Sequence, residues 1–212
     1  MIDWTDVASF ATAGGTLVLA VATFASVRSA NRASRTAERA HLISVRPVLV
    51  PSRLEDRTEK VNWYDMHWAS VHGGRAIAEV VDGNIYLAMS LRNVGSGLAV
   101  LHGWWPTTDR ERAGRAHAPL EAFRMQTRDL YVPAGDLSFW QAAIREPADP
   151  DYDDLVAAIN ERRLISIELL YGDHEGGQRT ISRFNLIPRS GDETDWMCTV
   201  ALHWNLDQPD PR

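Results

Sequence analysis

A long uncharged run opens the chain. No charged side chain occurs from Val7 to Val27, where the sequence reads VASFATAGGTLVLAVATFASV. A helix of this length covers about 30 Å, which is the thickness of the hydrocarbon core of a bilayer. The pattern therefore predicts a transmembrane helix over residues 7–27, preceded by a short extracytoplasmic N-terminus of residues 1–6.

Charge on the two sides of this run predicts its orientation. The preceding residues include Asp3 and Asp6, whereas a secretory signal peptide begins with a positive region. Four arginines follow the run at spacings of three and four: Arg28, Arg32, Arg35 and Arg39. By the positive-inside rule, we expect a single-pass protein of the cell membrane with its N-terminus outside and its C-terminal domain in the cytoplasm.

Residues 28–45 continue the helical pattern. They contain good helix formers and neither proline nor glycine, so they predict a helical stalk that ends before Pro47. Inside the uncharged run, small residues stand four apart as Ala11 and Gly15, and again as Ala22 and Ser26. This spacing allows a second helix to approach closely, so a homo-oligomer with a structural role in a membrane assembly is one open alternative.

Beyond the stalk the pattern changes to short strands. Ile85, Leu87, Met89 and Leu91 alternate with other residues in the run 84–94, which is the period of a half-buried strand. The pair Asp82-Gly83 predicts a tight turn before it. Further strands are expected at 47–50, 76–81, 97–105, 123–132, 137–143, 164–171, 179–187 and 196–204. We expect 123–132 and 137–143 to form a hairpin, and a short helix over 151–163 with acidic residues in its first turn.

This order of elements predicts a mainly β fold. Many short strands with few intervening helices favour an antiparallel immunoglobulin-like sandwich with one short helix, over residues 46–206. Residues 207–212 predict a disordered polar tail.

Composition narrows the classes of function. The chain has 212 residues and a net charge of -6, with no clustered basic face in its C-terminal part, so nucleic acid is excluded as the main partner. A lone cysteine, Cys198, excludes an internal disulfide framework and a cysteine-based zinc site. In an apparent strand, Cys198 is expected to behave as a small buried hydrophobe.

A motif after the alternating strand carries a family resemblance. Asn93-Val94-Gly95-Ser96-Gly97-Leu98-Ala99 matches the form N-x-G-x-G-x-A, and it follows a membrane helix and an Arg46-Pro47 pair. In this it resembles uncharacterised bacterial single-span membrane proteins with an immunoglobulin-like β-sandwich, as do the segments 132–135 and 171–173. The resemblance implies a fold and an anchor but carries across no catalytic residue. The glycines and the Asn93 side chain favour a structural turn.

Histidines offer the strongest candidate chemistry. Five of the six histidines in the C-terminal part are candidates, with Asp65, Asp173 and Glu175 close by in sequence: His67, His72, His102, His174 and His203. Consecutive residues on a strand face opposite ways, so Asp173, His174 and Glu175 do not chelate one ion easily. We therefore assign no metal site, no catalytic residue and no cofactor.

Tryptophan is the other distinctive residue type. The C-terminal part contains seven: Trp63, Trp68, Trp104, Trp105, Trp140, Trp196 and Trp204. Most are expected in the core, while the adjacent Trp104 and Trp105 must face opposite ways on a strand. The sequence thus favours a membrane-tethered, non-enzymatic β-sandwich that binds a protein partner at the cytoplasmic face. The alternative is a small-molecule or metal-dependent activity built on histidines, signalled by His102, His174 or His203 meeting a carboxylate in a cleft.

Overall fold

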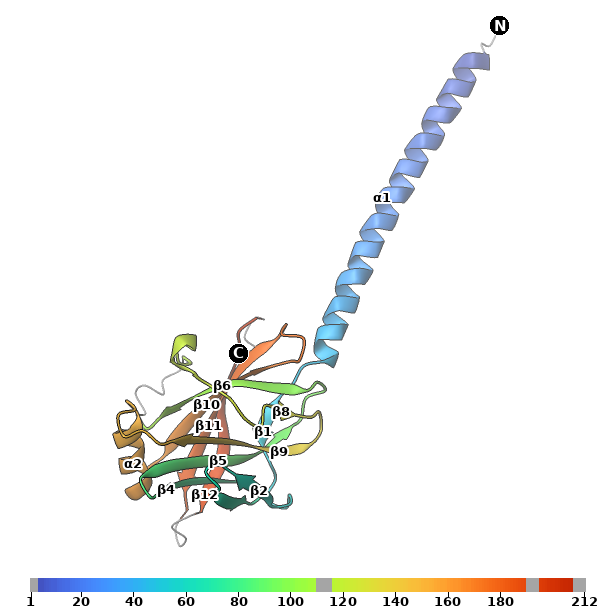
Figure 1. Ribbon diagram of the computed structural model, residues 1–212. Coiled ribbons are helices and arrows are strands. Elements are labelled where there is room, and N and C mark those ends of the chain that lie inside the picture. Colours follow the sequence, from blue (N-terminus) through green and yellow to red (C-terminus); the bar gives the residue numbers. More distant parts are fainter. Residues whose placement is uncertain (1–3, 110–115, 190–194, 208–212) are drawn as a thin grey trace. The chain divides into compact units, whose positions relative to one another are not determined.

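The computed structural model describes residues 4–109, 116–189 and 195–207, with side chains described from residue 14 onward (Figure 1). It divides into two compact units, Met1–Ile43 and Ser44–Arg212. A single helix, α1 (Trp4–Ser44), makes up the first unit. The predicted helicity of residues 28–44 is thus confirmed, and the helix ends before Pro47 as expected.

The hydroxyl groups of α1 bond to its own backbone. Thr23 Oγ1 donates to the Leu19 carbonyl and Ser26 Oγ to the Ala22 carbonyl, each at 2.8 Å. Within the described residues, no helix has both the length and the hydropathy of a membrane span. Residues 7–13 of the predicted span lie outside the part whose side chains are described.

The second unit is mainly β, as predicted. Its strands are β1 (Leu49–Pro51), β2 (Glu59–Asn62), β3 (Trp68–Val71), β4 (Arg75–Val81), β5 (Asn84–Asn93), β6 (Ala99–Thr107), β7 (Arg124–Met125), β8 (Tyr131–Val132), β9 (Leu137–Ile144), β10 (Ile165–Gly172), β11 (Arg179–Pro188) and β12 (Trp196–Asn205). A short 3-10 helix, η1 (Leu120–Ala122), and helix α2 (Tyr152–Asn160) lie between strands. All strand pairs are antiparallel.

The strands form two layers that meet along one side (Figure 1). In the first layer, β5 pairs with β9 on one edge and with β4 and β1 on the other. In the second layer the order is β12-β11-β10-β6, and β6 also pairs with β7 and β8. Only two residue pairs join β4 to β12, so the sheet bends sharply there into a sandwich-like arrangement.

Strand β5 contributes to two cores. Its residues Ile85, Leu87, Met89 and Leu91 point into the main core between the layers, which confirms the predicted alternation. Tyr86 and Ala88 point the other way, into a smaller core beneath the β2–β3 hairpin. Both faces of this strand are therefore buried. The main core also takes four of its largest fully buried side chains from later strands: Trp140, Tyr171, Phe184 and Trp196.

Two features of the second unit differ from the sequence-based expectation. The expected strand 123–132 is two short strands, β7 and β8, and both pair with β6 rather than with β9. The hairpin predicted between 123–132 and 137–143 is therefore wrong, because residues 133–136 link strands of different layers. The β2–β3 hairpin was not predicted, since its strands are only four residues long and β2 begins with the charged pair Glu59-Lys60.

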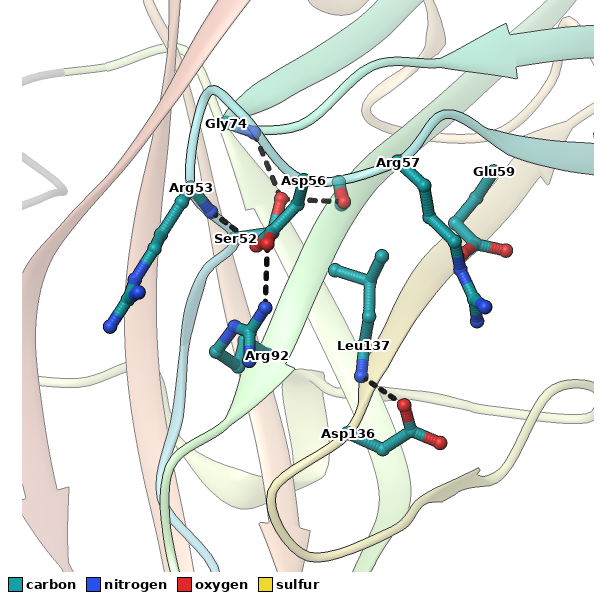
Figure 2. A network of polar contacts seen from close by, with 10 residues as sticks. Ser52, Arg53, Asp56, Arg57, Glu59, Gly74, Arg92, Asp136 and Leu137 are labelled. Carbon is teal, nitrogen blue, oxygen red and sulfur yellow. Dashed lines mark hydrogen bonds and ion pairs between the residues drawn. The ribbon is translucent and has the colours of Figure 1, made fainter.

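A polar network holds the β1–β2 loop against β5 (Figure 2). Asp56 accepts a hydrogen bond from the Arg53 amide (2.7 Å) and forms an ion pair with Arg92 of β5 (2.6 Å). The bond from the Arg53 amide, aided by Arg92, lowers the pKa of the Asp56 carboxyl. Beside it, Ser52 Oγ accepts from the Gly74 amide (2.9 Å) and lies 2.7 Å from Ser90 Oγ. The network explains how a loop without regular structure is held in place.

Asn93 confirms that the glycine motif has a structural turn role. Its fully buried carboxamide makes four hydrogen bonds. Oδ1 accepts from the amides of Val48 (3.1 Å) and Gly95 (3.0 Å), and Nδ2 donates to the carbonyls of Gly97 (2.7 Å) and Val132 (3.0 Å). One side chain therefore joins β1, β5, the β5–β6 turn and β8.

Truncating this side chain is expected to destabilise the fold strongly. Asn93→Ala removes two buried and two part-buried hydrogen bonds to the backbone, at about 1–3 kcal/mol for each buried group left unpaired. We expect the free energy of unfolding to fall by about 3 kcal/mol or more, measured by urea titration of the full-length chain in mild detergent. Asn84→Ala is the control, because Asn84 makes one long bond (3.4 Å) to the Tyr86 hydroxyl. Equal losses for the two variants would contradict this role of Asn93.

Candidate functional site

The candidate site is a cavity on the open side of the sandwich, where β7 and β9 form neighbouring edges of the two layers. Its volume is about 280 Å³. Twelve residues line it: Trp63, Tyr64, Trp104, Arg124, Met125, Gln126, Thr127, Arg128, Gln141, Ala142, Ala143 and Arg145. These lining side chains include arginines, amides and aromatic rings, so the cavity joins cationic and polar groups to an apolar wall.

Gln126 connects the two layers at the cavity. Its Nε2 donates to the carbonyls of Arg128 (2.7 Å) and Gln141 (3.1 Å), and its Oε1 accepts from the Trp140 indole (3.1 Å). The side chain is buried together with that of Gln141. Because β9 supplies Gln141 and Trp140, these bonds hold the edge of the first layer to the segment that follows β7.

Arg124 is held over an aromatic ring. Its Nη2 donates to Asp149 and Asp151, each at 2.6 Å, and its guanidinium carbon lies 5.1 Å from the centre of the Trp104 ring. The two carboxylates come from the segment before α2. They orient the guanidinium of Arg124, and their negative charges compensate its positive charge.

Arg145 occupies the opposite wall. Its Nε donates to Asp65 at 2.9 Å, and its guanidinium carbon lies 4.1 Å from the centre of the Tyr64 ring. Asp65 also accepts from the Tyr86 hydroxyl at 2.7 Å. Burial opposes ionisation of Asp65, but the bonds from Arg145, Tyr86 and the His67 amide outweigh it and lower the pKa of this carboxyl to about 2.

Two atoms of the lining residues lack a hydrogen-bond partner within the described part of the chain. They are Gln141 Oε1 and Arg145 Nη2, and both are withdrawn from solvent. An unpaired buried polar group costs about 1–3 kcal/mol, and more if charged. Two residues that line the cavity thus each have one buried polar atom, an acceptor and a cationic donor, whose hydrogen bonds are unmade.

An exposed apolar surface borders the cavity. We call Tyr64, Met66 and Trp68 of the β2–β3 hairpin the aromatic tip; they are 70%, 69% and 56% exposed. Met125, on the opposite rim, is 79% exposed. Met66 has a φ of 66°, a left-handed conformation that is uncommon for a residue other than glycine. Such conformations persist where surrounding contacts hold the backbone, and here the Met66 amide donates to the Trp63 carbonyl at 3.0 Å.

The predicted histidines lie apart. His67 bonds Glu79 (2.8 Å) and stacks on Tyr86 with ring centres 4.0 Å apart. His72 lies 2.8 Å from Thr58 Oγ1 and lines a second cavity, of about 320 Å³, with Glu79 and Asp195. Among the residues with described side chains, no three metal-ligating groups converge.

The other predicted histidines occupy separate places. Burial lowers the pKa of His102, Arg179 acts in the same direction, and Asp173 opposes them. Asp173 itself caps a turn by accepting from the Gly177 amide (2.9 Å) and from Gln178. The exposed His174 lies in that turn.

His203 closes a hydrogen-bonded chain across the second layer. The Leu49 amide donates to the Tyr171 hydroxyl (3.2 Å), which lies 3.0 Å from Ser182 Oγ, and Ser182 lies 3.0 Å from His203 Nδ1. Ser182 is fully buried, so its hydroxyl is not open to a substrate from solvent, whereas His203 is partly exposed.

Cys198 and most tryptophans are placed as the sequence indicates. Cys198 is buried with its sulfur 3.7 Å from that of Met89, and burial raises the pKa of its thiol. Four of the seven tryptophans are buried: Trp63, Trp104, Trp140 and Trp196. Trp104 points into the core and Trp105 is only half-buried, in line with opposite faces. Sequence reasoning did not single out the arginines of the cavity, because they come from segments far apart in the chain.

The low pKa of Asp65 gives a pH-dependent contribution to stability. The carboxyl titrates near 3.8 when unperturbed and at about 2 in the folded protein, so its contribution is present above the higher value and is lost as the pH falls toward 2. We expect Asp65→Asn to be less stable than the parent, by a difference that shrinks as the pH falls from about 5 to about 2. Urea titrations across this range measure it. Asp153→Asn, at an exposed carboxylate, is the control. A difference that does not vary with pH would exclude the proposed titration.

Comparisons with known proteins found no match: no protein-family model, no curated protein and no solved structure matches the chain.

Proposed function

We propose that this chain is a non-enzymatic protein-binding module, tethered by α1 to the cytoplasmic face of the cell membrane. The observation that carries the binding role is the aromatic tip beside the cavity. The tether and the orientation are supported by the first unit.

The apolar side chains of α1 support the tether. Leu17, Val18 and Leu19 are 67–69% exposed, and at 100° per residue three consecutive positions point in three directions. A soluble helix buries one apolar stripe, whereas a helix that is apolar on all sides is typical of a membrane span or of the core of a large protein. A bilayer covers all these directions at once. The self-bonded hydroxyls of Thr23 and Ser26 fit the same surroundings.

The orientation is supported by the charges that follow. Arginine is absent from residues 7–27 and recurs every three or four residues from Arg28 to Arg39, all within α1. We infer that this stripe lies at the cytoplasmic surface. We also propose that the sandwich is immunoglobulin-like, a class supported by its two antiparallel layers and by the glycine motif.

The aromatic tip supports a protein partner. Large apolar side chains gathered at one exposed place are typical of an interaction surface, and aromatic residues and methionine are enriched at interface cores. Tyr64, Met66, Trp68 and Met125 supply these residue types. The hairpin that carries three of them is anchored by Asp65 to Tyr86 and Arg145, so the surface is largely formed before binding.

The histidine-based alternative has one location in its favour. His72, Glu79 and Asp195 line the second cavity, where a histidine and carboxylates share a cleft. A small-molecule activity there is the second candidate function. Loss of a partner-independent activity in His72→Ala would support it.

The orientation is testable by thiol labelling, because the buried Cys198 has a raised pKa and is expected to stay unreactive. A cysteine introduced by Asp153→Cys, on exposed helix α2, should react with a membrane-impermeant maleimide only after cells are permeabilised. Asp3→Cys should react in intact cells. Labelling of Asp153→Cys in intact cells would contradict the proposed orientation. Release of the chain from membranes by alkaline extraction would contradict the proposed membrane tether.

The binding surface is testable by site-specific photo-crosslinking of the full-length chain in its native membranes. A benzophenone amino acid at Tyr64, Trp68 or Met125 should yield an adduct of one common size. The control position is Tyr131 of β8, an aromatic residue 60% exposed and outside the aromatic tip, which should yield none. Equal adducts at all four positions would argue against a defined binding surface.

A further inference from the structure

The cavity between β7 and β9 has groups suited to a single negative charge. Arg124, Arg128 and Arg145 line it, and none of its twelve lining residues, all described, carries a carboxylate. The carboxylates that orient Arg124 and Arg145 come from outside the lining set. The arginine N–H donors therefore line a cavity in which no other lining residue is negatively charged.

The arginines retain hydrogen-bond donors. A guanidinium has five N–H groups, and the ion pair to Asp65 uses Arg145 Nε while Nη2 has no partner within the described part of the chain. The two ion pairs of Arg124 both use Nη2. Because the guanidinium planes are already held by these bonds and by the Tyr64 and Trp104 rings, little order is lost when an anion binds.

The surrounding charges favour a carboxylate over a phosphate. Asp65, Asp149 and Asp151 are bonded to the cavity arginines, and Asp129 is bonded to Gln141. Four carboxylates thus stand close behind three arginines. These four carboxylates repel a phosphate, with a charge near -2, more than they repel a carboxylate with a charge of -1. Hydrogen bonds from the arginines are available to either anion.

The walls and the size of the cavity indicate what carries the carboxylate. Trp63, Trp104 and Ala142 provide an apolar surface, and the unpaired Gln141 Oε1 is an acceptor for an N–H group. A volume of about 280 Å³ suits one or two side chains. The aromatic tip and Met125 extend the apolar surface beyond the cavity. This suits a ligand that extends beyond the carboxylate group held in the cavity.

We propose that this cavity binds an aspartate or glutamate side chain within an extended segment of the partner protein, with an adjacent aromatic side chain against Trp63 and Trp104. The arginines accept the carboxylate, and a peptide N–H of the segment reaches Gln141. This inference rests on the proposed function, since it names the chemistry by which that surface selects its partner.

The test uses a defined probe and the indole N–H signals of the full-length, ¹⁵N-labelled chain in detergent micelles. The probe is the blocked dipeptide N-acetyl-Glu-Phe-amide, compared with N-acetyl-Gln-Phe-amide and with inorganic phosphate. Trp63 and Trp140 are the reporters, because their indoles donate to Ala142 and Gln126 of the cavity. Trp196, whose indole donates to the Ala78 carbonyl, is the internal control.

We expect the Glu dipeptide to shift both reporters saturably and the Gln dipeptide to bind about tenfold more weakly, as the loss of a charge-assisted hydrogen bond implies. Arg128→Gln, which breaks no described ion pair, and Arg145→Gln should each weaken binding by about tenfold or more. Arg163→Gln is the matched control, since Arg163 pairs with Glu161 near the end of α2. Equal binding of the two dipeptides, stronger binding of phosphate, or no shift at all would overturn the inference.

The two proposals fail in different ways. Crosslinks at Tyr64 and Trp68 without a preference for the Glu dipeptide would leave the protein-binding surface in place and remove the acidic anchor. A Glu-dependent shift without crosslinks would keep the carboxylate site and overturn the protein partner in favour of a free small carboxylate.

Discussion

The Asn93 carboxamide is the constraint on which the second unit depends. It satisfies two amides and two carbonyls from four places in the chain, so its oxygen and its nitrogen are both fully used. Aspartate has no N–H to offer, and glutamine is one methylene longer. The backbone at Val45 and Arg46 passes so close to Gly97 and Gly95 that a Cβ there would overlap its carbonyls. The turn thus requires both the asparagine and the glycines.

This anchor sets the register that builds the cavity. Strand β5 begins at a tight turn, with Asp82 and Gly83 at positive φ, and ends at Asn93, and its pairing with β9 runs from Ile85 to Arg92. The pairing places Gln141 and Arg145 at the open side of the first layer. On the other layer, β6 places Trp104 and, through β7, Arg124. The cavity lies between these two edges.

Local sequence patterns predicted many of the helices and strands. Long-range contacts determined how the strands pair and which residues meet at the cavity. Alternation identified β5, and the Asp82-Gly83 pair identified its turn, because both signals lie within ten residues. The segment 123–132 contains enough β-forming residues to suggest one strand, but it splits because Gln126 turns inward to bond Trp140 and Gln141. The site was not predictable in the same way. Asp65 and Arg145 are separated by 80 positions, and no local spacing indicates that they meet.

The chain from Leu49 through Tyr171 and Ser182 to His203 has a direction. The Tyr171 oxygen accepts from the Leu49 amide, so its own hydrogen finds an acceptor in Ser182, and the Ser182 hydrogen then points to His203 Nδ1. In this arrangement, which gives every hydroxyl hydrogen an acceptor, the imidazole accepts at Nδ1. The entry of the chain into β1 is thereby connected to the last strand by one continuous line of hydrogen bonds through three side chains.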